Sequence, residues 1–121
     1  MNNISDSELI KTIIEGIQER KGKDITHVDL KKLDVSSAQD FLICSGTSTS
    51  HVAALADSVR EYVQENTGVK PYNYDGYKNS QWIVIDYGTV FVHIFLPEVR
   101  EYYSLESLWN DAEITEIPNL D

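Results

Sequence analysis

The architecture of this chain is clearest in residues 82–96, which run Trp82-Ile83-Val84-Ile85-Asp86-Tyr87-Gly88-Thr89-Val90-Phe91-Val92-His93-Ile94-Phe95-Leu96. Two runs rich in β-branched and aromatic residues flank Gly88, and this pattern predicts two antiparallel strands joined by a tight turn. Pro97 follows the second run and ends it, because proline has no N–H to donate to a sheet. Residues 82–96 therefore predict a β-hairpin.

The two faces of this hairpin differ in chemistry, because successive side chains of a strand point to opposite sides. The first face is aliphatic and is expected to lie against helices; it comprises Ile83, Ile85, Val90, Val92 and Ile94. The second face mixes aromatic rings with a carboxylate and an imidazole: Trp82, Val84, Asp86, Phe91, His93 and Phe95. Such a mixture suits an interface better than a core, since aromatic anchors supply binding energy. The alternative is that Asp86 and His93 pair with each other or with a covering loop.

The segments before the hairpin predict further elements. Apolar residues at helical spacing indicate a helix over about residues 6–21, and Ser5 with Glu8 forms a plausible capping box. Alternation over residues 25–33 predicts a half-buried strand. The unbroken apolar run 41–44 suits a strand that is covered on both faces.

A second helix is expected to begin after Gly46 and to end at Gly68. Residues 69–76 contain Pro71 and predict a weak edge strand or a loop. Beyond the hairpin, short helices are expected from Glu98 and around Leu105, Leu108 and Trp109, and a frayed tail from about residue 113. This order of elements predicts one α/β domain over residues 1–121, a mixed sheet of about five strands with helices packed on it.

Charge and composition narrow the range of partners. The 121 residues include 20 acids and 10 bases, which gives a net charge of -10. Residues 98–121 alone hold seven acids and one base. An acidic chain repels phosphate backbones, so we expect no direct nucleic-acid binding, whereas a basic protein would be attracted. The simpler alternative is that the charge only keeps the protein soluble.

Sequence features also bear on the cellular compartment. A single cysteine, Cys44, excludes an intrachain disulfide and fits a reducing environment. The first residues lack a basic region followed by an apolar run, so no secretory signal is predicted. No apolar stretch approaches membrane-spanning length. We therefore expect a cytoplasmic protein with no membrane contact.

Candidates for catalysis are weak. Cys44 lies inside an apolar run, and the histidines at 27, 51 and 93 lack metal-binding spacing, so we expect neither a metal nor a cofactor. The segment Ser45–Ser50 leads from a strand into a helix and could hold an anion, although hydroxyl groups there more often cap the helix. A nucleotide-binding transferase or hydrolase that uses this loop is the alternative function. It would need paired carboxylates for magnesium, and no such pair is visible near Asp57 or Asp86.

Several motifs together identify a family. They are Asp40-Phe41-Leu42-Ile43-Cys44-Ser45-Gly46-Thr47-Ser48, His51-Val52 with Ala56-Asp57, Trp82-Ile83-Val84-Ile85-Asp86-Tyr87-Gly88, Val92-His93-Ile94-Phe95 and Arg100-Glu101-Tyr102-Tyr103-Ser104-Leu105-Glu106-Ser107-Leu108-Trp109-Asn110-Asp111-Ala112. With these motifs the chain resembles the ribosomal silencing factors, also called the Iojap family, from about Leu9 to Ala112. The chain departs from the usual family pattern at Thr89, where Asp is common, and at Ser50, where Arg is frequent.

The resemblance implies a function without catalysis. Such factors bind ribosomal protein fourteen of the large subunit, block joining of the small subunit and so repress translation. The resemblance also implies a topology similar to nucleotidyltransferases, without their catalytic acids. The expected docking surface comprises Trp82, Asp86, His93, Phe95, Tyr102, Tyr103, Leu105 and Trp109. Within this surface, Trp82 and Trp109 are expected to be anchors, and Asp86 is expected to contact a basic side chain of the partner. A homodimer of the free protein is a further expectation.

Overall fold

The computed structural model describes residues 4–31, 39–108 and 111–120. Its elements in chain order are α1 (Asp6–Glu19), β1 (Lys23–Asp29), β2 (Asp40–Ser45), α2 (Thr49–Thr67), β3 (Asn73–Asp75), β4 (Trp82–Asp86), β5 (Val90–Phe95), α3 (Pro97–Tyr103), α4 (Leu105–Leu108) and β6 (Glu113–Ile117). The strands form a six-stranded sheet in the order β3-β4-β5-β2-β1-β6. The pair β2 and β5 is parallel and the other pairs are antiparallel, so the predicted mixed sheet is confirmed.

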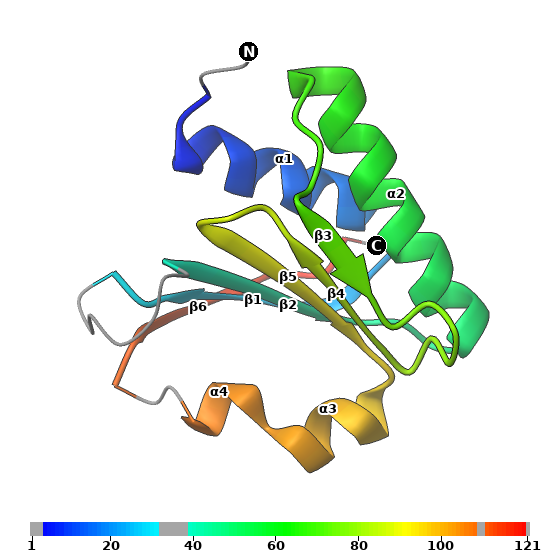
Figure 1. Ribbon diagram of the computed structural model, residues 1–121. Helices are drawn as coiled ribbons and strands as arrows, with labels where there is room; N and C mark the ends of the chain where they lie inside the picture. The colour runs from blue at the N-terminus through cyan, green and yellow to red at the C-terminus, as the bar shows by residue number, and fades with distance from the viewer. Residues whose placement is uncertain (1–3, 32–38, 109–110, 121) are drawn as a thin grey trace.

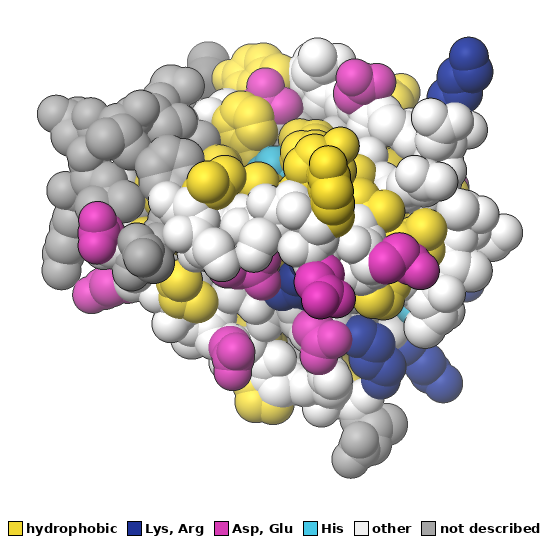
Figure 2. Space-filling view, turned by 90° about the horizontal axis from the view of Figure 1, so that it is seen from below, with side chains coloured by type: hydrophobic (Ala, Val, Ile, Leu, Met, Phe, Trp, Pro, Cys, Tyr) yellow, Lys and Arg dark blue, Asp and Glu magenta, His cyan; other side chains and the backbone are white. Residues whose placement is uncertain are grey.

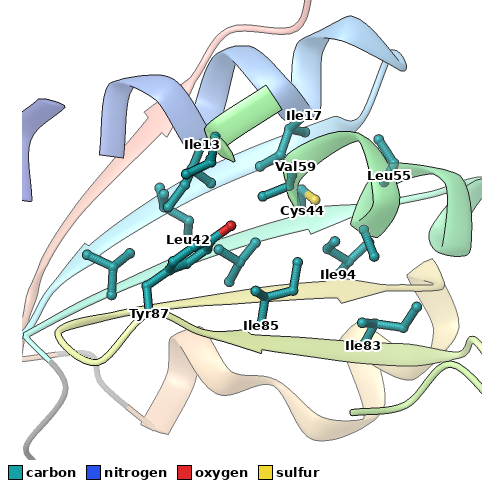
Figure 3. Close-up of a cluster of buried hydrophobic side chains, with 14 of the residues drawn as sticks. Ile13, Ile17, Leu42, Cys44, Leu55, Val59, Ile83, Ile85, Tyr87 and Ile94 are labelled. Carbon is teal, nitrogen blue, oxygen red and sulfur yellow. The ribbon is translucent and has the colours of Figure 1, made fainter. Parts of the chain in front are cut away.

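The helices lie on both faces of the sheet. In Figure 1, α1 and α2 cover the upper face, while α3 and α4 lie below the lower face. All five members of the aliphatic face of the hairpin are fully buried: Ile83, Ile85, Val90, Val92 and Ile94. They share a core cluster with the inward stripes of α1 and α2, which include Ile13, Ile17, Leu55 and Val59 (Figure 3). The prediction that this face packs against helices is confirmed.

Local sequence signals set the ends of both long helices. Ser5 Oγ accepts a hydrogen bond from the N–H of Glu8 at 3.1 Å, and Ser48 Oγ accepts one from the N–H of His51 at 3.1 Å. These caps satisfy N–H groups that have no partner within the helix. Gly68 ends α2 in the left-handed conformation, with φ of 76°. A residue with a Cβ is strained there, which is why glycine is the usual terminator.

The expected frayed tail is wrong, because residues 113–117 form strand β6. Its register on β1 runs from Ile25 opposite Ile117 to Asp29 opposite Glu113. Asn119 extends the contact, since its Oδ1 accepts a hydrogen bond from the N–H of Asp24 at 2.9 Å. Most β6 side chains are exposed, so backbone pairing rather than burial holds the strand. The segment therefore lacks the apolar alternation that would have predicted a strand. The sheet has six strands instead of about five.

The guanidinium of Arg100 fastens α3 to strands β1 and β2 of the sheet. Arg100 donates to Glu106 at 2.7 Å and 3.1 Å, to Ser45 Oγ at 2.9 Å, to Thr26 Oγ1 at 3.0 Å and to the carbonyl of Asp24 at 2.7 Å. These partners come from three elements, α4, β2 and β1, so one side chain of α3 joins α3 to all three. Its planar fork of donors is suited to this role, whereas lysine offers a single point charge.

Replacing Ile85 with Asp should unfold the protein. Ile85 is fully buried in the larger core cluster, and an unpaired carboxylate there costs more free energy than a domain of this size can lose. The matched control is Val84→Asp, one residue away on the opposite, half-buried side. Circular-dichroism melts check both variants, and a folded Ile85→Asp protein would contradict the assignment of the two faces.

Replacing Arg100 with Met or Lys should loosen α3 and α4 from the sheet. The lost charge-assisted bonds predict a decrease of about 2–3 kcal/mol in the free energy of unfolding, and Lys should restore little of it. Urea unfolding measures the loss, and limited proteolysis near Tyr102 reports the detachment. The exposed neighbour Glu101→Gln is the control and should change stability by less than about 0.5 kcal/mol. Full stability of Arg100→Met would refute the fastening role.

Candidate interaction surface

A continuous row of aromatic contacts crosses the lower face of the sheet. Ring centroids lie 5.1 Å apart for Tyr102 and Tyr103, 4.8 Å for Tyr103 and Trp82, and 5.9 Å for Trp82 and His93. The row continues at 4.8 Å from His93 to Phe41 and at 6.1 Å from Phe41 to Phe91. These distances fall in the range of favourable ring pairs. We call this row the aromatic surface; it comprises Phe41, Trp82, Phe91, His93, Tyr102 and Tyr103.

Three elements build the aromatic surface together with α3. The parallel register of β2 on β5 places Phe41 opposite Phe91, and the antiparallel register of β4 on β5 places Trp82 opposite Phe95. Tyr102 and Tyr103 come from the last turn of α3. Side chains that are far apart in sequence thus meet on one face. Figure 2 shows this face, on which hydrophobic side chains gather around a histidine and acidic side chains lie beside them.

Trp82 sits near the middle of the row and is held from several directions. Its ring stacks on Phe95 with centroids 4.9 Å apart and planes inclined by 22°. Its Nε1–H donates a hydrogen bond to His93 Nδ1 at 3.1 Å. The third contact is the ring of Tyr103. The indole is half-buried, so part of it is open to a partner while its orientation is fixed.

His93 is the buried member of the aromatic surface and carries no charge at neutral pH. Its side chain lies among Phe41, Trp82 and Phe95, and burial lowers its pKa to about 4. Because Nδ1 accepts from the indole, the proton of the neutral ring is on Nε2. Within the described part of the chain, Nε2 has no hydrogen-bond partner. Direct contact between His93 and a partner does not fit this burial.

Asp86 does not pair with His93, so that part of the alternative is wrong. Its Oδ1 accepts a hydrogen bond from the N–H of Gly88 at 2.7 Å and so shapes the hairpin turn. Gly88 has φ of 92°, a conformation that residues with a Cβ rarely adopt. The side chain of Asp86 is half-buried at one end of the face. Its charge therefore lies beside the aromatic surface, and one of its oxygens is already in use.

The remaining expected contact residues have different positions. Phe95 is fully buried and forms a second core cluster with Val28, Leu30 and Ile43. Leu105 packs against this cluster from α4 and is half-buried. Neither side chain is displayed on the aromatic surface, so the expectation that Phe95 lies exposed for docking is corrected. Trp109 lies outside the described residues.

Two members of the aromatic surface were not predicted as site residues. Phe41 was assigned to a strand covered on both faces, and Phe91 was placed on the second face without a role. Both side chains are half-buried, whereas Leu42, Ile43 and Cys44 are fully buried as expected. The position of Phe91 on the mixed face of the hairpin was the one sequence feature that could have indicated its place in the site. Nothing in the local pattern of residues 41–44 indicates which neighbour β2 pairs with.

Acidic groups flank the aromatic surface on the α3–α4 side. A hollow of about 390 Å³ lies beside these helices and is lined by Asp24, Ser45, Pro97, Arg100, Glu101, Ser104, Glu106 and Ser107. Arg100 is the single base in this lining, and its charge is paired with Glu106 at 2.7 Å. Glu101 and Asp24 do not take part in that ion pair, so their negative charges add to the lining. This side of the face is therefore complementary to a basic partner.

The groups considered for catalysis are occupied by structural bonds. Ser48 caps α2, and Ser45 Oγ accepts from Arg100. His51 Nδ1 accepts from the N–H of Thr47 at 2.9 Å, so its Nε2–H donates to the carbonyl of Arg20 at 2.6 Å. Cys44 is fully buried, and burial raises the pKa of its thiol to about 12. The prediction that a hydroxyl group of the segment Ser45–Ser50 caps the helix is confirmed, and Ser48 is the residue that does so.

The described residues contain neither a metal-ligand cluster nor a membrane-spanning helix. Across residues 4–31, 39–108 and 111–120, no group of three or more His, Cys, Asp or Glu side chains could hold a metal ion. In the same ranges, no helix has the length and apolar character needed to cross a membrane.

Comparisons with known proteins identify the family. The family model described as ribosomal silencing factor during starvation matches residues 3–121. A ribosomal silencing factor of Halalkalibacterium halodurans is 33% identical over 114 residues, which cover 94% of this chain and 96% of that protein. The factor of Chromobacterium violaceum is 40% identical over 102 residues, 84% of this chain and 82% of that protein. The mouse protein named mitochondrial assembly of ribosomal large subunit protein 1 is 30% identical over 102 residues, 83% of this chain and 44% of its own length.

Solved structures agree with the sequence comparison. A crystal structure of a Chromobacterium violaceum protein superposes with a TM-score of 0.84 at 38% identity and covers 88% of each chain. A crystal structure of a Bacillus halodurans protein gives a TM-score of 0.78 at 31% identity, over 92% of this chain and 99% of that one. These values show the same fold as well as the same family. The chain is therefore a member of the ribosomal silencing factor family.

Proposed function

We propose that this protein represses translation by docking on ribosomal protein fourteen of the large subunit and blocking association of the small subunit. The observation that carries the proposal is the aromatic surface, whose rings contact one another across β2, β4, β5 and α3. Family membership supports an action on the ribosome. The name of the mouse relative, which refers to the ribosomal large subunit, supports the choice of subunit.

The chemistry of the surface suits a basic protein partner. Aromatic side chains at the centre of an interface supply much of its binding energy, and Trp82 is already held in one orientation. Tyr102 and Tyr103 are 82% and 48% exposed and extend the contact area along α3. The acids beside α3 attract a basic ribosomal protein and repel bare phosphate backbones. The aromatic rings then supply the specificity of the contact, and the charges supply the long-range attraction between the two proteins.

The proposed roles follow from burial. Trp82, Tyr102 and Tyr103 contact the partner, together with Phe41 and Phe91. Asp86 places its charge next to a basic side chain of the partner. Phe95 and Leu105 support the surface from beneath, because both belong to the second core cluster. The expectations for Trp109, for a homodimer of the free protein and for a cytoplasmic location stay predictions.

Obstruction rather than catalysis is the proposed mode of action. The hydroxyl, imidazole and thiol groups of Ser48, His51 and Cys44 are bound or buried, which leaves no obvious nucleophile and base among them. A body of 13.8 kDa on the joining face of a subunit is large enough to exclude the other subunit sterically. Saturable, magnesium-dependent nucleotide binding that is lost in Ser48→Ala would instead support a transferase or hydrolase.

The protein should sediment with purified large subunits and not with small subunits. The complex should weaken as salt rises, because charge contributes to the encounter. Added protein should also reduce formation of whole ribosomes from mixed subunits, which density gradients measure. Cosedimentation with small subunits alone would overturn the proposal.

Trp82→Ala should weaken binding to large subunits by about thirtyfold or more, because truncation of a central aromatic anchor typically costs about 2 kcal/mol or more. Asp86→Asn tests charge separately, since asparagine keeps an oxygen for the N–H of Gly88. We expect a few-fold loss of affinity and a shallower salt dependence for this variant. Binding titrations and thermal melts check both variants. A folded Trp82→Ala protein with normal affinity would place the docking site elsewhere.

Cys44 should be inert in the folded protein. Its thiol is fully buried and, with a pKa of about 12, stays protonated at pH 8, so thiol reagents should react only after unfolding. Cys44→Ala should keep normal affinity for large subunits and lose about 1–2 kcal/mol of stability through a small cavity. Thiol titration in buffer and in denaturant makes the comparison. Loss of ribosome binding by a folded Cys44→Ala protein would show a functional role for the thiol.

A further inference from the structure

His93 is an unusual choice for its position. The imidazole lies among aromatic rings, with Phe41 at 4.8 Å and Phe95 at 6.2 Å between centroids, and it is only 7% exposed. In the described part of the chain its buried Nε2–H has no partner. A buried donor without a partner lowers stability, so a leucine or phenylalanine would suit these surroundings better. Stability of the core therefore does not explain the histidine.

One polar contact does explain it. His93 Nδ1 is the acceptor of the Trp82 indole N–H at 3.1 Å. A phenylalanine or leucine at this position would leave that N–H without an acceptor on this side. The indole would then lower its free energy by turning toward water, because a tryptophan N–H seeks a partner when it is covered.

The orientation of Trp82 matters because a partner must meet the ring in one position. Stacking on Phe95 at 4.9 Å and contact with Tyr103 at 4.8 Å fix the plane of the indole only in part, since apolar contacts are not directional. The hydrogen bond to His93 selects which edge of the indole points into the sheet. An anchor that is fixed before binding loses less conformational freedom when the partner docks.

We propose that His93 is a positioning residue: its Nδ1 lone pair holds the Trp82 indole in the docking orientation, and the imidazole itself does not contact the partner. This inference rests on the proposed function, in which Trp82 anchors the large subunit. It changes the role expected for His93 from direct contact to preorganisation. His93 therefore affects binding of the partner only through the orientation of Trp82.

The experiment compares His93→Leu with His93→Asn. Asparagine can place its Oδ1 near the position of Nδ1 and accept from the indole, whereas leucine cannot. The protein has two tryptophans, so it gives two indole N–H resonances, and the spectrum of Trp82→Phe assigns them. For each variant we would measure the chemical shift of the Trp82 indole N–H, its exchange rate with water, the thermal melt and the affinity for large subunits.

His93→Leu should fold with unchanged or higher melting temperature, speed exchange of the Trp82 indole proton by tenfold or more, and weaken binding about tenfold. His93→Asn should return exchange and affinity most of the way toward the parent values. If His93→Leu does not fold, His93→Phe takes its place with the same expectations. A purely structural role would instead lower the melting temperature in proportion to the loss of binding, and rescue by asparagine would fail.

Two results would overturn the positioning role. Normal affinity in His93→Leu despite a freed indole would show that the orientation of Trp82 is unimportant. Lost affinity with an unchanged indole resonance and exchange rate would show that His93 contacts the partner directly. Failure of the proposed function is recognised separately, because the parent protein itself would then not sediment with large subunits, whereas a Trp82→Ala protein that binds normally would only place the docking site elsewhere. In either case the positioning role falls as well.

Discussion

The parallel pairing of β2 with β5 is the contact on which the rest of this molecule depends. It joins the β4–β5 hairpin to the β1–β2 pair and so makes one sheet from two sequence-distant halves. It buries Leu42 and Cys44 beneath α1 and α2, and on the opposite face it sets Phe41 beside Phe91. Both the core and the aromatic surface arise from this single register. A slip by one residue would exchange the two faces and expose the aliphatic core.

The two faces of the sheet are finished in different ways. Two long helices cover the upper face over the central strands, where the aliphatic hairpin residues have no exposed surface. The lower face has only the short helices α3 and α4. Arg100 fastens these helices to β1 and β2. Phe95 is covered there while Trp82 stays half open. Partial cover of this kind supports each ring from beneath and leaves a surface that a partner can use.

Local patterns in the sequence were reliable where local physics is sufficient. The hairpin alternation, the serine caps and the terminating Gly68 involve residues that lie close together in the chain, so their outcome depends little on the rest of the fold. The tail shows the opposite case. Nothing in the sequence of Glu113–Ile117 indicates strong burial, and the segment becomes a strand because β1 presents a free edge to it.

The amino-acid sequence alone established the family, the two-faced hairpin and the burial of Cys44, since motifs and side-chain alternation are written in consecutive residues. The tertiary structure was needed for the place of Phe41 in the aromatic surface, the fastening by Arg100 and the bond between Trp82 and His93. Each of these joins residues on different elements. Their geometry depends on strand register and helix placement, which emerge only when the whole chain minimises its exposed apolar surface and unpaired polar groups.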